Sequence, residues 1–124
     1  MNWKDIIVSK KNNSFKYKDA QLFDKVFDEV LKYHSPGIAP VKDGSGWYHI
    51  DVKGNEVYKE RYNRVFGYYF NRASVIKGKN WFHINELGKR LYDANYVWTG
   101  NYQENVCSVR DFTNQYFHID LEGI

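Results

Sequence analysis

The sequence predicts a mainly β protein made of tandem antiparallel repeats, arranged like a solenoid or a curved sheet and preceded by an amphipathic capping helix. The first observation is a segment that occurs three times, as Trp47-Tyr48-His49-Ile50-Asp51, Trp81-Phe82-His83-Ile84-Asn85 and Tyr116-Phe117-His118-Ile119-Asp120. Its period of 34–35 residues is typical of repeat architectures. The second is an aromatic content of 19%, because aromatic side chains favour half-buried pleated surfaces.

The length and charge of the chain limit the classes of protein to consider. Its 124 residues suffice for one domain with a modest core. We divide it into an N-terminal segment, residues 1–35, and about two and a half β repeats over residues 36–124. Residues 36–124 hold 11 Lys and Arg against 10 Asp and Glu, a charge of only +1 that argues against a nucleic-acid binder. No apolar run approaches the roughly 20 residues that span a bilayer, so we expect no membrane role.

The first 18 residues allow two interpretations. A β-branched run at Ile6-Ile7-Val8 and an alternating segment, Phe15-Lys16-Tyr17-Lys18, flank a turn signal at Asn12-Asn13-Ser14. This order predicts a β-hairpin. The alternative is a loosely held terminal arm.

Residues 20–33 predict an amphipathic helix. Apolar side chains recur at helical spacing, and they are Leu22, Phe23, Val26, Phe27, Val30 and Leu31. Asp19 precedes them as a candidate N-cap, and Ser35-Pro36-Gly37 follows as a stop signal. Because terminal repeats need polar caps, we expect this helix to cover the end of a β stack.

From Pro36 onward the pattern predicts three elements in each unit. An apolar strand comes first, with Ala39 and Val41 followed at a spacing of 34 by Ala73 and Val75, then by Cys107 and Val109. The aromatic-His strand and a tight turn follow, and a third short strand lies near the tyrosines. The turn residues and their glycines are Asp51, Asn85, Asp120, Gly54, Gly88 and Gly123. Gly67 and Gly100 lie between aromatic segments and indicate a bulge, a bend or a close backbone approach.

The aromatic-His-Ile-Asp segment with its glycine resembles the WG-type repeats, the KWG-like β-rich repeats of bacterial proteins. The matching residues are Gly46-Trp47, Tyr48-His49-Ile50-Asp51 and Gly54, and their counterparts in the second and third copies. The Trp-then-Gly order of that family is not kept here, and Gln115-Tyr116 stands where tryptophan is expected in the third copy. The resemblance implies a β-repeat fold without catalytic residues, used as an interaction module.

The residues that carry reactive chemistry do not form a catalytic or metal-binding pattern. Equivalent strands of successive repeats lie about 10 Å or more apart, whereas a metal lies about 2 Å from each nitrogen ligand. His49, His83 and His118 are therefore expected to bond to neighbours within their own repeats, with no metal and no other cofactor. Cys107 occupies the position of two alanines and is expected to be a small core residue. We expect no enzyme activity.

The tyrosines and arginines are the candidate binding residues. Six tyrosines form three periodic pairs, and if they lie in rows on the outer face, they make an aromatic ladder to which three arginines add charge. The residues are Tyr58, Tyr62, Tyr68, Tyr92, Tyr96, Tyr102, Arg61, Arg64 and Arg72. The alternative is that these rings fill the core between strands. We therefore predict a module that binds another protein or a peptide; single-stranded nucleic acid or a small ligand is the second candidate.

Two further expectations concern assembly and location. The third copy stops at Gly123-Ile124, where the next strand should begin, so an unpaired strand is expected there. Such an edge is a template for self-association or for addition of a partner strand. The single cysteine and the absence of a signal-peptide pattern at the start of the sequence indicate a cytoplasmic protein.

Overall fold

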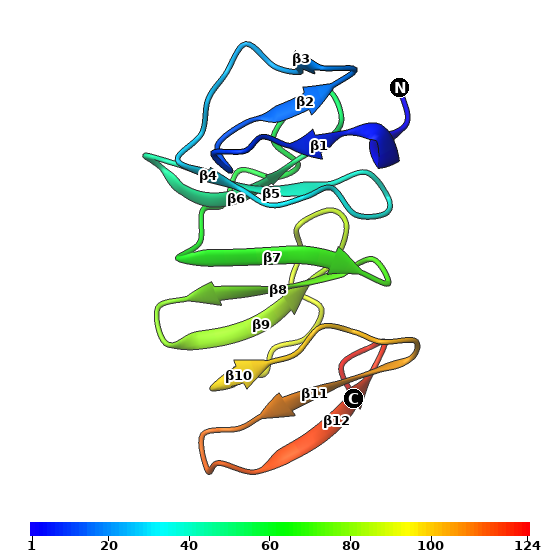
Figure 1. Cartoon of the computed structure of the whole chain (residues 1–124). Helices are drawn as coiled ribbons and strands as arrows, with labels where there is room; N and C mark the ends of the chain where they lie inside the picture. The colour runs from blue at the N-terminus through cyan, green and yellow to red at the C-terminus, as the bar shows by residue number, and fades with distance from the viewer.

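The computed structural model describes residues 1–124 and contains four three-stranded antiparallel sheets that follow one another from the first to the last part of the chain (Figure 1). A short 3-10 helix, η1 (Trp3–Asp5), precedes the first sheet, and there is no α-helix. The strands of the first two sheets are β1 (Ile7–Val8), β2 (Phe15–Tyr17) and β3 (Ala20–Gln21), then β4 (Glu29–Val30), β5 (Ala39–Asp43) and β6 (Gly46–Ile50). Those of the other two are β7 (Arg64–Tyr69), β8 (Arg72–Lys77) and β9 (Asn80–Ile84), then β10 (Trp98–Thr99), β11 (Val106–Arg110) and β12 (Tyr116–Asp120). The mainly β prediction is confirmed.

The last three sheets pair their second and third strands in the same register. Val41 lies opposite Tyr48, Val75 opposite Phe82, and Val109 opposite Phe117. These three valines have no exposed surface. Each sheet therefore contributes a buried valine to the interior, opposite the aromatic residue that precedes the histidine.

The core is an aromatic and aliphatic interior between the sheets. One cluster of 19 buried residues runs through the first three sheets, and a cluster of five lies in the fourth. Gly67 lies in β7 where the pairing with β8 shifts register, between Val65 and Tyr68. A side chain at Gly67 would come within 2.7 Å of the ring of His34, so a bulge and a close approach coincide there.

The predicted helix over residues 20–33 is wrong. Ala20–Gln21 belong to β3 and Glu29–Val30 to β4, and the residues between them are not helical. Their amide groups bond to distant strands: Phe27 N donates to Asn13 O at 2.7 Å, and Asp28 N donates to Lys42 O at 2.8 Å. These long-range bonds satisfy the backbone without a helix, and tertiary contacts override a helical apolar pattern.

The residues that signalled the helix have other roles. Asp19, the predicted N-cap, has a φ of 66° and lies in the turn between β2 and β3. Phe27 and Val30 are buried, but Val26 is 57% exposed, so the apolar residues do not form one continuous face. β4 pairs with β5, so the proposed division after residue 35 falls between two strands of one sheet.

β1 pairs with β2 in antiparallel register, so the first 18 residues form a hairpin rather than a free arm. No helix in the structure is long and apolar enough to cross a membrane.

Candidate functional site

Two of the three periodic histidines are buried and bonded to the following part of the chain. His49 Nδ1 lies 2.5 Å from the Tyr58 hydroxyl and Nε2 lies 2.8 Å from the Phe66 carbonyl oxygen. A carbonyl oxygen only accepts, so Nε2 carries the proton and Nδ1 accepts from the phenol. Burial lowers the pKa of His49 to about 4, so the ring stays neutral.

His83 repeats this arrangement one period later. Its Nδ1 lies 2.6 Å from the Tyr92 hydroxyl and its Nε2 lies 2.9 Å from the Gly100 carbonyl oxygen. Burial lowers its pKa to about 4 as well. Each ring thus links a loop tyrosine to the next sheet, His49 to Phe66 in β7 and His83 to Gly100 directly after β10. His118, by contrast, is solvent-exposed and has no hydrogen-bond partner of this kind.

The first sheet contains the same arrangement with phenylalanine in place of histidine. Phe15 packs edge-on against Phe23 at 6.2 Å and lies 4.9 Å from Tyr33. His49 makes the matching contacts with Tyr58 at 5.6 Å and with Tyr68 at 4.7 Å. Residues 15, 23 and 33 therefore occupy the places of residues 49, 58 and 68.

The turn residues act as expected from their side chains. The Asp51 carboxylate accepts hydrogen bonds from the amides of Lys53 and Asn55 at 2.9 and 3.0 Å. Asn85 and Asp120 make the equivalent bonds. The glycines that follow, Gly54, Gly88 and Gly123, all have a φ of 83°.

Reactive side chains do not gather into a metal or nucleophilic centre. No three His, Cys, Asp or Glu side chains lie close enough together to hold one ion. The Cys107 thiol is buried, 3.7 Å from His83 Nε2, and burial raises its pKa to about 11. A thiol in this environment stays protonated at neutral pH, which makes it a poor nucleophile.

The six candidate tyrosines lie inside the molecule and do not form an outer ladder. Five are 7% exposed or less, and Tyr92 is partly buried. Tyr68 donates to the Asn85 carbonyl at 2.7 Å, and Tyr102 donates to the Asp120 carbonyl at 2.5 Å. Tyr58 and Tyr62 pack edge to face, as do Tyr92 and Tyr96. Sequence periodicity showed that these positions are equivalent, but it carried no information on which way the rings point.

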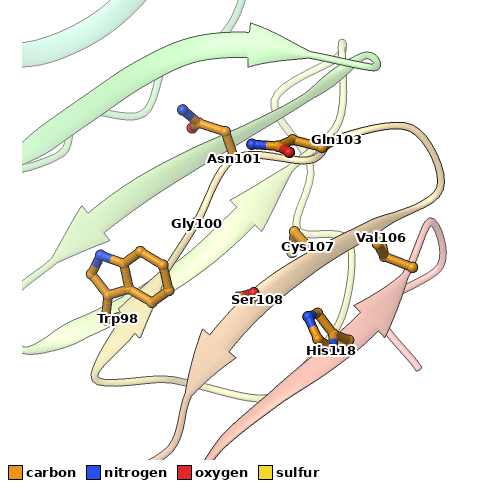
Figure 2. A pocket seen from close by; sticks show the side chains of 8 residues that line it. All are labelled: Trp98, Gly100, Asn101, Gln103, Val106, Cys107, Ser108 and His118. Carbon is orange, nitrogen blue, oxygen red and sulfur yellow. The ribbon is translucent and has the colours of Figure 1, made fainter.

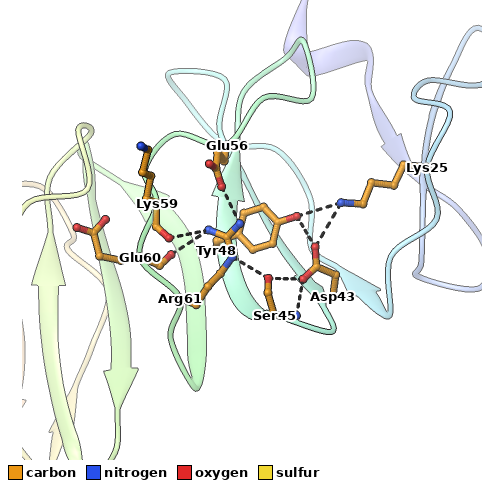
Figure 3. Close-up of polar contacts among 8 residues, drawn as sticks. All are labelled: Lys25, Asp43, Ser45, Tyr48, Glu56, Lys59, Glu60 and Arg61. Atoms are coloured by element: carbon orange, nitrogen blue, oxygen red, sulfur yellow. Dashed lines mark hydrogen bonds and ion pairs between the residues drawn. The ribbon is translucent and has the colours of Figure 1, made fainter.

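Arg61 and Arg72 make contacts within the chain. The Arg61 guanidinium lies over the Tyr48 ring, 3.7 Å from its centroid, and donates to Glu56 at 2.6 Å (Figure 3). The Tyr48 hydroxyl donates to the Asp43 carboxylate at 2.6 Å, and the Lys25 ammonium forms an ion pair with the same carboxylate (Figure 3). Arg72 Nε donates to the Leu121 carbonyl at 3.0 Å.

Arg64 belongs instead to a row of aromatic residues that sequence reasoning missed as a site. Its guanidinium lies 4.5 Å from the Trp47 ring centroid and 5.0 Å from that of Phe66. Phe66 stacks on Trp81 at 5.6 Å with an interplanar angle of 17°. Farther along, Trp98 meets Tyr116 edge-on at 6.3 Å. We call this row the side ladder, and its members are Trp47, Arg64, Phe66, Trp81, Trp98 and Tyr116.

The side ladder is accessible over most of its length. Trp47 is buried, the next four members are half-buried, and Tyr116 is 66% exposed. A hollow of about 200 Å³ is lined by Trp81, Trp98 and Phe66. The spacing of 34 between Trp47 and Trp81, and between Arg64 and Trp98, was the signal that could have identified this row from the sequence.

A second hollow, of about 320 Å³, lies beside His118 in the fourth sheet (Figure 2). Trp98 borders it on one side and β12 carries His118 on the other, with Cys107 and Ser108 between them (Figure 2). Its lining contains no Lys, Arg, Asp or Glu.

A comparison of the chain with protein-family models, with curated proteins and with solved structures finds no match.

Proposed function

We propose that this protein is a non-catalytic binding module built from tandem WG-type β repeats, and that it binds another protein or a peptide through the side ladder. The observation that carries the proposal is the half-exposed row of Trp, Phe, Tyr and Arg side chains along successive sheets. Trp, Tyr and Arg are the residues that contribute most to binding energy at protein interfaces.

The side ladder suits a protein ligand because its members are already held in place. Phe66 and Trp81 are stacked, and Arg64 is packed between Trp47 and Phe66, so little side-chain freedom is lost on binding. The Nε atom of Arg64 is buried and has no hydrogen-bond partner within the chain, so a ligand would reach this guanidinium through its terminal nitrogens. A ligand that supplies a carboxylate or a carbonyl oxygen beside this guanidinium would gain a charge-assisted hydrogen bond.

Single-stranded nucleic acid is the second candidate, because bases stack on aromatic side chains in a sequence-tolerant way. Residues 36–124 carry a charge of only +1, which supports the protein ligand over the nucleic acid. Arg61 is paired with Glu56, and Arg72 Nε donates to the Leu121 carbonyl, so fewer guanidinium donors are free for phosphates.

Quantitative affinity capture from the native cell tests the proposal, with the wild-type chain compared with Trp98→Ala. Loss of an interface tryptophan typically costs about 2 kcal/mol or more, so captured proteins should bind about 30-fold more weakly. Leu87→Ala is the matched control, because Leu87 is 71% exposed and lies outside the side ladder. Unchanged capture by Trp98→Ala, or a gel shift of random oligonucleotides at moderate salt, would contradict the proposal.

A further inference from the structure

The structure shows how a serine-histidine pair on one sheet holds the main chain of a neighbouring strand. Ser74 and His83 lie opposite each other on β8 and β9. Both bond to the Gly100 carbonyl oxygen, from Ser74 Oγ at 3.1 Å and from His83 Nε2 at 2.9 Å. The Thr99 hydroxyl donates to Ser74 Oγ at 2.9 Å, and the Tyr92 hydroxyl bonds to His83 Nδ1 at 2.6 Å. One segment, residues 92–102, supplies all of these partners; it bends at Asp93 and Val97 and contains β10.

The fourth sheet carries the same pair in the same register. Ser108 lies opposite His118 on β11 and β12, as Ser74 lies opposite His83. Here the two side chains line the hollow beside His118 and bond to no strand (Figure 2). The serine-histidine pair that bonds to residues 99 and 100 in the third sheet therefore has an equivalent in the fourth sheet whose side chains have no hydrogen-bond partner.

The surroundings of this pair are also uncovered. Val106 and Tyr116 are 46% and 66% exposed. Burying these apolar side chains would add a favourable term for any segment that bonds to His118.

We propose that the hollow beside His118 binds an extended segment of a partner protein with the chemistry of residues 92–102: a tyrosine, then a hydroxyl residue and glycine seven and eight positions later. The tyrosine hydroxyl bonds to His118 Nδ1. The glycine carbonyl accepts from His118 Nε2 and from Ser108, and the preceding hydroxyl bonds to Ser108. This goes beyond the side ladder: Trp98 borders both sites, but the ligand of the hollow bonds to His118 and Ser108, which are not members of the ladder.

Two other occupants fit less well. A second folded copy of this chain does not present such a segment, because Thr99 and Tyr102 are 3% and 1% exposed in its own stack. A phosphate or a nucleic acid would require cationic side chains, and the hollow has none. An imidazole with one N–H donor and one acceptor nitrogen, beside a serine hydroxyl, matches a main-chain carbonyl with its neighbouring hydroxyl groups.

A synthetic peptide with the sequence of residues 91–103, capped at both ends, is the ligand for the test. Titration of the isotope-labelled chain, followed by amide NMR, should give saturable one-to-one binding with shifts in β11, β12 and residues 98–103. His118→Phe and Ser108→Ala should each weaken peptide binding about tenfold, the value of one buried hydrogen bond. A peptide with Tyr92→Phe should lose a similar factor. Phenylalanine is a suitable replacement at both positions, because Phe15 and Phe23 of the first sheet occupy the places of the histidine and of the tyrosine.

The matched control, Leu87→Ala, should bind the peptide like the wild type, and so should Trp81→Ala. Unchanged peptide binding by Trp81→Ala separates this inference from the proposed function, because binding in the hollow does not require the side ladder to bind a protein. Absence of binding at millimolar peptide, or equal binding of a scrambled peptide, would overturn the inference. Shifts confined to β8 and β9 would overturn it too, because the peptide would then be replacing β10. Shifts in β12 that depend on protein concentration without peptide would assign the hollow to a second copy.

Discussion

The two buried histidines should make the fold sensitive to mild acid. The pKa of each lies at about 4, below the ordinary value of 6.5, and burial is the main cause. As pH falls through 6.5, the unfolded chain binds protons at His49 and His83 while the folded chain does not. Stability is therefore complete above pH 6.5 and is lost progressively as pH falls toward 4.

The size of the effect follows from the two pKa values of each ring. A histidine with a pKa of about 4 when folded and 6.5 when unfolded loses about 2 kcal/mol of stability between pH 7 and pH 5. The two rings together should cost the protein about 4 kcal/mol, which is a large part of the stability of a small domain. Burial also lowers the pKa of His34, which adds to the loss.

Urea unfolding at pH 7 and pH 5 measures this loss, and a double variant isolates one ring. His49→Phe with Tyr58→Phe reproduces the edge-on pair that Phe15 and Phe23 form in the first sheet. Replacing both partners of the hydrogen bond leaves no unpaired phenol, although the Phe66 carbonyl loses its donor. This variant should fold, and its loss of stability between the two pH values should fall to about 2 kcal/mol.

An unchanged pH dependence in the double variant would refute the reasoning, because the loss would then come from other groups. Carboxylates do not produce the same result. Hydrogen bonds from Ser45 and Tyr48 hold the pKa of the Asp43 carboxyl below its usual range, so it stays ionised in the folded chain at pH 5. An unfolded aspartate, with a pKa of about 3.9, is also mostly ionised at pH 5, so Asp43 contributes little to the loss between pH 7 and pH 5.

Five further substitutions, four of them in matched pairs, test the packing. Gly88→Ala should cost about 3 kcal/mol, because its φ is 83° and a Cβ would lie 2.4 Å from a tyrosine ring, whereas Gly78→Ala, with open space around it, should cost about 1 kcal/mol by urea unfolding. Val30→Asp should abolish the folded circular dichroism spectrum, because it places a charge in the core. Val26→Asp should leave the melting temperature nearly unchanged, because Val26 is exposed. Equal effects of the two substitutions would favour an amphipathic helix over residues 20–33. Tyr68→Phe should lose about 1–2 kcal/mol, because a buried carbonyl loses its donor, and an unchanged midpoint would contradict that role.

Much of the fold could be predicted because it depends on local chemistry. Alternation in Trp47-Tyr48-His49-Ile50 predicts a strand, and Asp51 with Gly54 predicts the turn that follows; both are present. Such features involve residues close in sequence, where the spacing alone states the geometry.

The candidate site was less predictable because periodicity identifies equivalent positions without showing their direction. Tyr68 and Tyr102 shared an environment as expected, but only the positions of the carbonyl oxygens of Asn85 and Asp120 show that the hydroxyls point inward. The side ladder combines residues of β6, β7, β9, β10 and β12; the spacing of 34 relates some of its members, but only the folded chain shows that they form one row.

Residues 20–33 show where the sequence alone ceased to decide the structure. Its apolar residues repeat at helical spacing, yet Phe27 and Val30 reach the core from an extended chain whose amides bond to Asn13 and Asn12. The sequence by itself determined a mainly β chain with an aromatic-His strand and a glycine turn in each unit. Only the tertiary structure decided the path of residues 20–33, the inward tyrosines and the open pair at Ser108 and His118. These depend on hydrogen bonds between residues far apart in the chain, which a local pattern does not contain.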